Sequence, residues 1–295
     1  MCASPLADAG GSARCPEGHS FDYARSGYLN LTRRSGGRGR VGDTAEMVRA
    51  RAEFLATGHY EPIAAAVRAA AVEAVCGPEE AAGEAAAGAA EATARATVVA
   101  EVGSGTGYYL DAVVRALRER GSGPGCGFGF DLSKAAAAHA ARRHPDLRFV
   151  VADVEEAIPL RDSAADLVLS AFAPRPGPEL GRVTRPGGGL VVALAGPRHL
   201  ERLRERLTLI GIQEDKLDRL TERLEPWFDL AGAATVEYEI ALSEDDARRL
   251  ALMGPSAHHD PDLTALAGEH TDLVSVTVAR FRRGVDQQSR SSSAS

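Results

Sequence analysis

Residues 97–107 read Thr-Val-Val-Ala-Glu-Val-Gly-Ser-Gly-Thr-Gly. The apolar run at 98–102 predicts a buried parallel strand, because a strand that is covered on both faces is continuously hydrophobic. Three glycines follow at alternate positions, and an apolar-periodic segment at 108–117 predicts a helix. Glycines allow a sharp turn and leave room for a ligand beside the backbone. The stretch therefore indicates a nucleotide-type site between a strand and a helix.

The spacing of the glycines distinguishes two kinds of nucleotide site. A dinucleotide fingerprint is G-x-G-x-x-G, whereas this loop alternates its glycines and carries an acid two residues before the first. The loop resembles motif I of class I S-adenosylmethionine (SAM) methyltransferases, whose cofactor carries an ammonium and a sulfonium that suit an acid. A tight turn without a ligand is the alternative, which we disfavour because the next strand also ends in an acid. The candidate cofactor-binding residues of the loop are Glu101, Gly103, Gly105, Thr106 and Gly107.

Two acids follow the next two predicted strands. The strand at 126–131 ends in Asp131, which lies where a carboxylate can accept hydrogen bonds from both ribose hydroxyls. Taken alone, Asp131 fits equally well as an N-cap of the helix that follows it. The strand at 147–151 precedes Asp153, where the resemblance to class I methyltransferases implies an adenine contact.

The pattern of strands sets the fold class. Helical segments separate the early strands, and further strands are expected at 166–171, 189–194, 235–242 and 273–282, which predicts an α/β domain over 97–283. The resemblance implies a Rossmann-like, seven-stranded, mostly parallel sheet in which one of the last two strands is antiparallel. The rest of the chain divides into a small N-terminal module with a basic linker (1–42), a helical connector (43–78), a low-complexity insertion (79–96) and a disordered tail (284–295).

Composition narrows the class of protein. The 295 residues contain no run of 18 apolar residues and no leader-like start, which predicts a cytoplasmic protein without a membrane partner. Four scattered cysteines do not indicate a disulfide framework. The net charge is −7, but seven arginines and two acids give residues 25–51 a charge of +5 and leave −12 elsewhere. A basic segment on an acidic body favours a local polyanion contact, and a solvated arginine face is the alternative.

The N-terminal module contains candidate metal ligands. A module of this size needs a cross-link such as a bound metal ion to fold. Cys15-Pro-Glu-Gly-His19 offers a thiolate and an imidazole in a tight turn, with Cys2 upstream. These three ligands fit a zinc knuckle, and a fourth is not evident. Aromatic side chains beside the arginines either stack RNA bases or fill the core of the module, and we favour the core. These aromatic residues are Phe21, Tyr23 and Tyr28.

The segment 15–31, Cys-Pro-Glu-Gly-His-Ser-Phe-Asp-Tyr-Ala-Arg-Ser-Gly-Tyr-Leu-Asn-Leu, closely resembles the N-terminal module of the RlmA-type 23S rRNA (guanine-N1)-methyltransferases. This family includes resistance enzymes of tylosin and mycinamicin producers. It implies a zinc site of the pattern C-x2-C…C-x3-H, in which Cys2, Cys15 and His19 match the last three ligands. The first ligand would fall ahead of Met1, so either the true start lies upstream or the site is incomplete. The resemblance also implies that Tyr60 and His199 line the SAM site.

The same resemblance implies a function. The protein is expected to methylate N1 of a guanine in a tunnel-lining hairpin of 23S rRNA, at position 748, and so to confer resistance to macrolides such as mycinamicin or tylosin. The zinc module and the basic linker would grip the hairpin. The alternatives are housekeeping methylation of a neighbouring guanine, a small-molecule methyltransferase, and a non-catalytic RNA-binding factor that keeps a SAM fold. The oligomeric state stays open, with a homodimer as one alternative.

Absent motifs narrow the chemistry further. The fourth strand does not end in Asn/Asp-Pro-Pro-Tyr, which disfavours methylation of an exocyclic adenine amine. Neither Cys76 nor Cys126 lies in a Pro-Cys turn, which disfavours C5-pyrimidine methylation through a covalent cysteine. Guanine N1 carries a proton that must leave, but the sequence assigns no general base. Asp153 and His199 are interpreted as cofactor contacts, and Phe172-Ala-Pro174 lies where a flipped base would be gripped.

Overall fold

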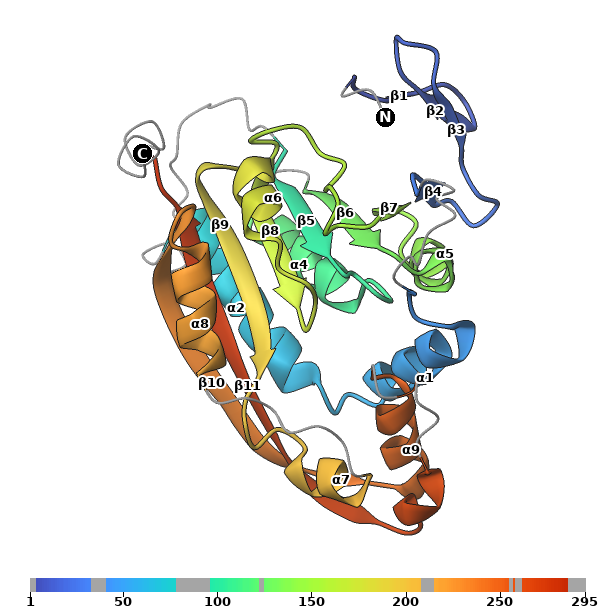
Figure 1. The fold of residues 1–295 in the computed structure, drawn as a ribbon, viewed down its shortest axis with the longest axis vertical. Helices are drawn as coiled ribbons and strands as arrows, with labels where there is room; N and C mark the ends of the chain where they lie inside the picture. The colour runs from blue at the N-terminus through green and yellow to red at the C-terminus, as the bar shows by residue number, and fades with distance from the viewer. Residues whose placement is uncertain are drawn as a thin grey trace.

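A twisted sheet of eight strands organises the molecule (Figure 1). The computed structural model describes residues 4–32, 41–77, 96–121, 125–207, 215–254, 257 and 262–285. The strand order is β10-β11-β9-β8-β5-β6-β7-β4. The Arg33-to-Arg40 linker, the insertion at 79–96 apart from Ala96, and the tail beyond Val285 lie outside the described residues.

The parallel part of the sheet is built from the predicted strands. β5 (Val98–Val102), β6 (Cys126–Asp131), β7 (Arg148–Val151), β8 (Ala165–Ala171) and β9 (Thr184–Ala195) pair in parallel. Helices α4 (Tyr108–Glu119), α5 (Lys134–Arg143) and α6 (Gly177–Val183) lie between them in the chain, as βαβ units require. The carboxyl ends of these strands therefore meet at one edge, where ligands of open α/β sheets bind.

A long antiparallel hairpin completes the other side of the sheet. β10 (Phe228–Leu242) pairs with β11 (His270–Arg283), and β11 pairs antiparallel with β9. The prediction that one of the last two strands is antiparallel is confirmed. Both strands are longer than predicted, and the hairpin extends past the parallel strands toward α7 (Glu201–Arg206) and α9 (Glu244–Leu252) (Figure 1).

Two hydrophobic cores cover the two faces of the sheet. Along β5, Val99 packs with residues of α2 (Glu61–Cys76), α4 and α5, whereas its neighbour Ala100 packs with residues of α6 and α8 (Lys216–Leu224). Alternate residues of a strand point to opposite faces, so the continuous apolar run at 98–102 supplies both cores. Among the helices of the described ranges, none combines the length and apolar character that a membrane span requires.

The N-terminal residues form a small sheet and then join the large one. β1 (Ala7–Asp8), β2 (Ser12–Arg14) and β3 (Ser20–Asp22) pair antiparallel, and β4 (Leu29–Asn30) pairs in parallel with β7. This last pair adds the eighth strand, which the sequence did not indicate because β4 has only two residues. The aromatic side chains Phe21 and Tyr23 pack against a small core that includes Leu29 and Leu31, and Tyr28 packs against the large core. The interpretation of Phe21 and Tyr23 as core residues of the module is confirmed, whereas Tyr28 packs against the core of the large domain.

The helical segment after the basic linker leads to the carboxyl edge of the sheet. It consists of α1 (Ala45–Ala56) and α2, separated by a turn at 57–60. The N-cap of α1 is Thr44, whose hydroxyl accepts a hydrogen bond from the Met47 amide at 3.3 Å. α1 packs beside α9 at the carboxyl edge of the sheet (Figure 1).

Candidate functional site

The glycine loop makes two close approaches that exclude larger residues. Gly103 has φ of +64°, and a Cβ there would lie 2.5 Å from the Cβ of Ala173. Gly107 has φ of +78°, and a Cβ there would lie 2.9 Å from Cζ of Phe149. Non-glycine residues rarely adopt this left-handed region. The two glycines therefore set the path of the loop against neighbouring elements.

Glu101 lies beneath the loop and caps the helix that follows it. Its side chain is buried, and Oε2 accepts a hydrogen bond from the Leu110 amide at 3.1 Å. Gly107, at the N-cap of α4, has no side chain for this purpose, so the carboxylate satisfies one of the free amides of the first turn. Burial raises the pKa of Glu101 well above its usual value, the Leu110 amide lowers it, and the negative charge of Asp131 raises it.

Asp131, the last residue of β6, is hydrogen-bonded to the glycine loop. Its Oδ2 accepts a hydrogen bond from the Gly105 amide at 2.8 Å, and its Oδ1 accepts one from the Ser133 amide at 2.8 Å. Ser133, and not Asp131, is the N-cap of α5, because its hydroxyl accepts from the Ala136 amide. Burial raises the pKa of Asp131, and the hydrogen bonds from the Ser133 and Gly105 amides partly offset this by lowering it. The carboxylate thus remains at the carboxyl end of β6, beside the glycine loop.

The side chain of Arg51, from α1, also lies beside the glycine loop. Its Nη1 forms an ion pair with Oδ2 of Asp43 at 2.5 Å, and its Nη2 donates to the Met253 carbonyl at 2.6 Å. A Cβ on Gly105 would lie 3.1 Å from Nη1. Arg51 therefore ties together α1, the glycine loop and the end of α9, and its positive charge lies beside the loop backbone.

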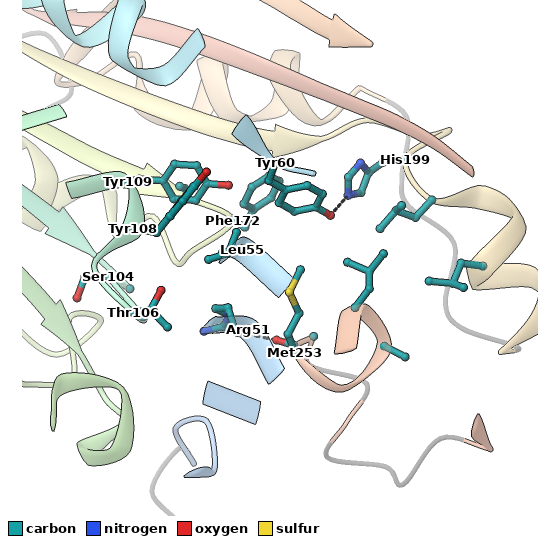
Figure 2. A pocket seen from close by; sticks show the side chains of 18 of the residues that line it. Arg51, Leu55, Tyr60, Ser104, Thr106, Tyr108, Tyr109, Phe172, His199 and Met253 are labelled. Carbon is teal, nitrogen blue, oxygen red and sulfur yellow. Dashed lines mark hydrogen bonds between the residues drawn. The ribbon is translucent and has the colours of Figure 1, made fainter. Parts of the chain in front are cut away.

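A pocket of about 320 Å³ opens between these elements (Figure 2). Pockets of this size hold small-molecule ligands and cofactors. Its floor is the glycine loop, and its walls come from α1, the start of α4, the end of β8, α7 and α9. The lining residues used below are Arg51, Tyr60, Ser104, Tyr109, Phe172, His199 and Arg204.

A buried pair, Tyr60 and His199, forms one wall. Nδ1 of His199 faces the Ser275 amide at 3.3 Å, and Nε2 lies 3.3 Å from Oη of Tyr60 (Figure 2). Because an amide can only donate, Nδ1 is the acceptor, and the neutral ring carries its proton on Nε2 and donates it to Tyr60. The Tyr60 hydroxyl then keeps its own hydrogen for a ligand acceptor.

Both members of this pair are neutral near pH 7. Burial, then the positive charges of Arg204 and Lys216, lower the pKa of His199 to about 4. Burial also raises the pKa of Tyr60 far above its usual value. His199 is therefore a weak base with both ring nitrogens engaged, which agrees with its interpretation as a contact residue and not as a general base.

Two buried hydroxyls in the pocket have no hydrogen-bond partner in the part of the chain that the structure describes. They are Oγ of Ser104 and Oη of Tyr109. A buried polar group without a partner is costly. Both oxygen atoms are covered by protein, and a Cβ on Gly129 of β6 would lie 2.7 Å from Oγ of Ser104, so a ligand such as SAM would reach them only after the lining shifts.

Phe172 occupies the mouth of the pocket in a strained conformation. It follows β8, has φ of +55° and is 42% exposed. Its ring lies near those of Tyr60, Tyr109 and His199, with centroid distances of 6.5, 6.3 and 6.2 Å. Left-handed backbone in a bulky residue is rare and concentrates at functional sites. The arrangement presents an aromatic face at the entrance, where a planar ligand can stack.

The pocket brings together most of the predicted cofactor residues. Those that line it are Tyr60, Glu101, Gly103, Gly105, Thr106 and His199. Gly107 instead packs toward Phe149, Asp131 holds the loop from outside the lining, and Asp153 accepts a hydrogen bond from the Glu155 amide at 3.0 Å. Their assignment to SAM stays a prediction.

Sequence reasoning missed five polar residues of the pocket lining, which are Arg51, Ser104, Tyr108, Tyr109 and Arg204. Arg51 was counted only within the basic segment. Tyr109 was counted only as part of an apolar period.

Cys15 and His19 are positioned to share one metal ion. Sγ of Cys15 lies 3.2 Å from Nδ1 of His19, and the Cys15 amide donates to the His19 carbonyl in the same turn. A thiolate and an imidazole this close would supply two of the four ligands of a tetrahedral zinc site, so their assignment to zinc stays a prediction. The third predicted ligand, Cys2, lies outside the described residues, among which no group of three or more metal-ligating side chains gathers.

Comparison with known proteins identifies both parts of the chain. Residues 1–32 match a zinc-ribbon family described as "RlmA, N-terminal", and residues 99–188 match a methyltransferase domain. The 23S rRNA (guanine(748)-N(1))-methyltransferase of Streptomyces fradiae is 38% identical over 282 residues, which are 94% of this chain and 92% of that protein. A Micromonospora griseorubida protein named "Putative 23S rRNA (guanine-N(1)-)-methyltransferase" is 40% identical over 288 residues, 95% of this chain and 93% of its own. The predicted resemblance is thus confirmed: this SAM-dependent enzyme belongs to the 23S rRNA (guanine-N1)-methyltransferase family, whose N-terminal module is a zinc ribbon.

Proposed function

We propose that this protein methylates N1 of guanine 748 in 23S rRNA. The observation that carries the proposal is the relationship to the Streptomyces fradiae enzyme, which extends over 94% of the chain and includes both the N-terminal module and the pocket. The exposed ring of Phe172 in the lining of the pocket also supports the proposal, because an extruded base can stack on it.

The cofactor would be held by residues at the carboxyl edge of the sheet. SAM, when bound, supplies an electrophilic methyl group. The carboxylate of Glu101 and the backbone of the glycine loop would hold its charged groups, and Asp131 would accept the ribose hydroxyls once the loop adjusts. Tyr60, with its hydrogen directed by His199, would donate to an acceptor of the cofactor. We retain Gly107 and Asp153 as the other predicted members of this set.

The protein would act on the guanine mainly by positioning it. Methyl transfer is an in-line displacement, so proximity and orientation supply most of the acceleration. Phe172 would stack on the extruded base, because aromatic side chains commonly hold bases outside a helix. His199, with a pKa of about 4, is a poor acceptor for the N1 proton. We therefore expect this proton to leave to solvent or to a group of the RNA.

The N-terminal module would bind the rRNA hairpin that contains the target. We propose that Cys2, Cys15 and His19 hold zinc there, and that the basic linker contacts phosphates. A methyl group on a guanine of the drug tunnel would hinder a bulky glycosylated lactone, so resistance to macrolides such as mycinamicin or tylosin is the expected consequence. The same chemistry at the neighbouring guanine would be a housekeeping modification.

The test is methyl transfer from labelled SAM to unmodified 23S rRNA, with the product nucleotide mapped by mass spectrometry. We expect N1-methylguanine at position 748, and no incorporation when that guanine is replaced by adenine. Incorporation at the neighbouring guanine would assign the housekeeping role. A protein that binds SAM but transfers no methyl group to RNA would overturn the proposal and favour a small-molecule substrate.

A further inference from the structure

Four basic side chains gather beside the mouth of the pocket. Arg175 follows the Phe172-Ala-Pro174 turn, Arg204 of α7 lines the pocket, and Lys216 and Arg223 belong to α8. The Arg223 guanidinium donates to the Arg175 carbonyl at 3.4 Å. We call these four residues the mouth cluster.

Each of the four charges acts on another basic group of this set or on His199. Burial and the charge of Arg223 lower the pKa of Arg175. Burial, then the charges of Arg175 and Arg204, lower the pKa of Lys216. The charges of Arg204 and Lys216 also reach His199, at the back of the pocket. The cluster is therefore continuous with the cofactor pocket.

The mouth cluster lacks the ion pairs that several other arginines make. Examples of such pairs on the described surface are Arg115 with Asp111, Arg182 with Glu179 and Arg249 with Glu53. No member of the mouth cluster makes such a pair in the described ranges. In addition, Nε of Arg204 is buried without a hydrogen-bond partner there.

The helical geometry of α8 keeps its acids away from the cluster. At about 100° per residue, Lys216 and Arg223 lie on one face, while Asp218 and Glu222 lie on the opposite one. Like charges without counter-charges repel one another, and in a protein of net charge −7 such a group is maintained at a cost to stability. An arrangement of this kind favours an anion that arrives from outside.

The position of the cluster identifies the anion. A base that is extruded into the pocket brings its own backbone to the mouth, so the phosphates on either side of it lie at the entrance. Phe172 is only three residues before Arg175, so the stacking face and one of the four cations belong to the same turn. We propose that the mouth cluster clamps the phosphates that flank the target guanine. This inference rests on the proposed function and adds a second RNA contact, distinct from the N-terminal module.

The experiment measures binding of the full-length protein to a 23S rRNA hairpin that contains guanine 748. Fluorescence anisotropy is recorded between about 50 and 300 mM salt for the wild type, for Arg175→Ala, Lys216→Ala and Arg223→Ala, and for the triple variant. Arg115→Ala removes an equal charge that is already paired, and Arg223→Lys keeps the charge of the cluster. SAM affinity is measured for every variant by calorimetry.

Each lost phosphate contact should weaken RNA binding about fivefold near 0.15 M salt and reduce the slope of log K against log salt by about 0.7 to 0.9. The Arg115→Ala and Arg223→Lys variants should bind nearly as tightly as the wild type. SAM affinity should stay within about twofold, and thermal stability should hold or rise because repulsion is relieved.

Three results would overturn the inference. The first is a triple variant whose RNA affinity and salt slope equal those of Arg115→Ala. If the wild type still methylates the hairpin, this result leaves the proposed function intact. The second is a loss of SAM affinity with unchanged RNA affinity, which would assign the cluster to the cofactor carboxylate. The third is a wild type that neither binds nor methylates the hairpin, which would remove the proposed function as well.

Discussion

Replacement of Glu101 separates two roles of one carboxylate. Its Oε2 caps α4 through the Leu110 amide, and its negative charge is proposed to serve the cationic cofactor. Glu101→Gln keeps an oxygen acceptor of the same size and removes the charge. Glu101→Ala removes both. Asp272→Ala is a matched control, because Asp272 caps α7 through the Leu203 amide at 2.7 Å but does not line the pocket.

The structure sets the expected change in stability. Glu101→Ala leaves the Leu110 amide buried without an acceptor, which costs about 1–3 kcal/mol. Asp272→Ala should cost a similar amount, because a lost helix cap is worth about 0.5–2 kcal/mol. Glu101→Gln should cost little, because the amide oxygen can accept the same hydrogen bond. Denaturant unfolding of the three variants measures these differences.

The pH dependence of stability tests the buried charge. Because burial raises the pKa of Glu101 in the folded protein, the wild type loses stability as pH rises from the unfolded value of 4.5 through the folded one. Glu101→Gln lacks this titration. Its stability relative to the wild type should therefore increase as pH rises above 4.5. A relative stability that stays constant over this range would show that the carboxylate is not strained by burial.

Cofactor affinity completes the test. A hydrogen bond to a charged group is worth about 1.5–3 kcal/mol, so Glu101→Gln should weaken SAM binding about ten- to hundredfold. Asp272→Ala should leave the SAM dissociation constant nearly unchanged. If Glu101→Gln binds SAM as tightly as the wild type, the acid serves only to cap α4, and the argument from cofactor charge is refuted.

Three further predictions concern the same site. Gly107→Ala should lose about 2–4 kcal/mol in denaturant unfolding, because its positive φ and the approach to Phe149 both oppose a Cβ; unchanged stability would show that the loop yields freely. Since the pKa of His199 is about 4 when folded and 6.5 in a model peptide, the wild type should lose stability as pH falls between these values, and His199→Gln should show a shallower slope. An equal slope in calorimetric scans would contradict the neutral buried imidazole. Phe172→Ala should lower kcat/KM for rRNA about ten- to hundredfold, from the 1–3 kcal/mol of base stacking, with SAM affinity kept. A loss of SAM affinity alone would make Phe172 a cofactor contact.

Local patterns predicted the parallel core of the fold well. The run at 98–102 and the strand at 126–131 coincide with β5 and β6 to the residue, because both are short, continuous and bounded by turn residues. The prediction placed the start of β9 at 189, whereas the strand begins at Thr184. Thr184 pairs with Ala165, and the regular pairing with β8 resumes only at Gly189, opposite Leu167. Arg185-Pro-Gly-Gly forms an irregularity inside β9, where Gly187 has φ of +71°, so the turn propensity of this segment is kept and only the isolated Thr184–Ala165 pair was missed.

The site was predictable where one short segment supplies the chemistry, and not where distant segments converge. The glycine loop and its acid follow from spacing alone. Arg51 enters the pocket because α1 packs beside α9, and its guanidinium reaches the Met253 carbonyl 202 residues away. No periodicity within α1 distinguishes this arginine from a solvated one. The mouth cluster likewise joins a β8 turn, α7 and α8, which are separated in the chain by other elements.

The two helices that border the pocket share a capping device that local sequence cannot reveal. α4 begins after Gly107 and α7 after Leu200, and neither residue supplies a side-chain cap. Buried acids from neighbouring strands replace these caps, as Glu101 accepts from Leu110 and Asp272 from Leu203. In both cases the amide is the third of its helix, the position that an ordinary N-cap side chain would satisfy. Because each cap crosses from strand to helix, the start of each helix is fixed to the sheet, and a ligand contact made by Tyr109 of α4 is held in register with the glycine loop.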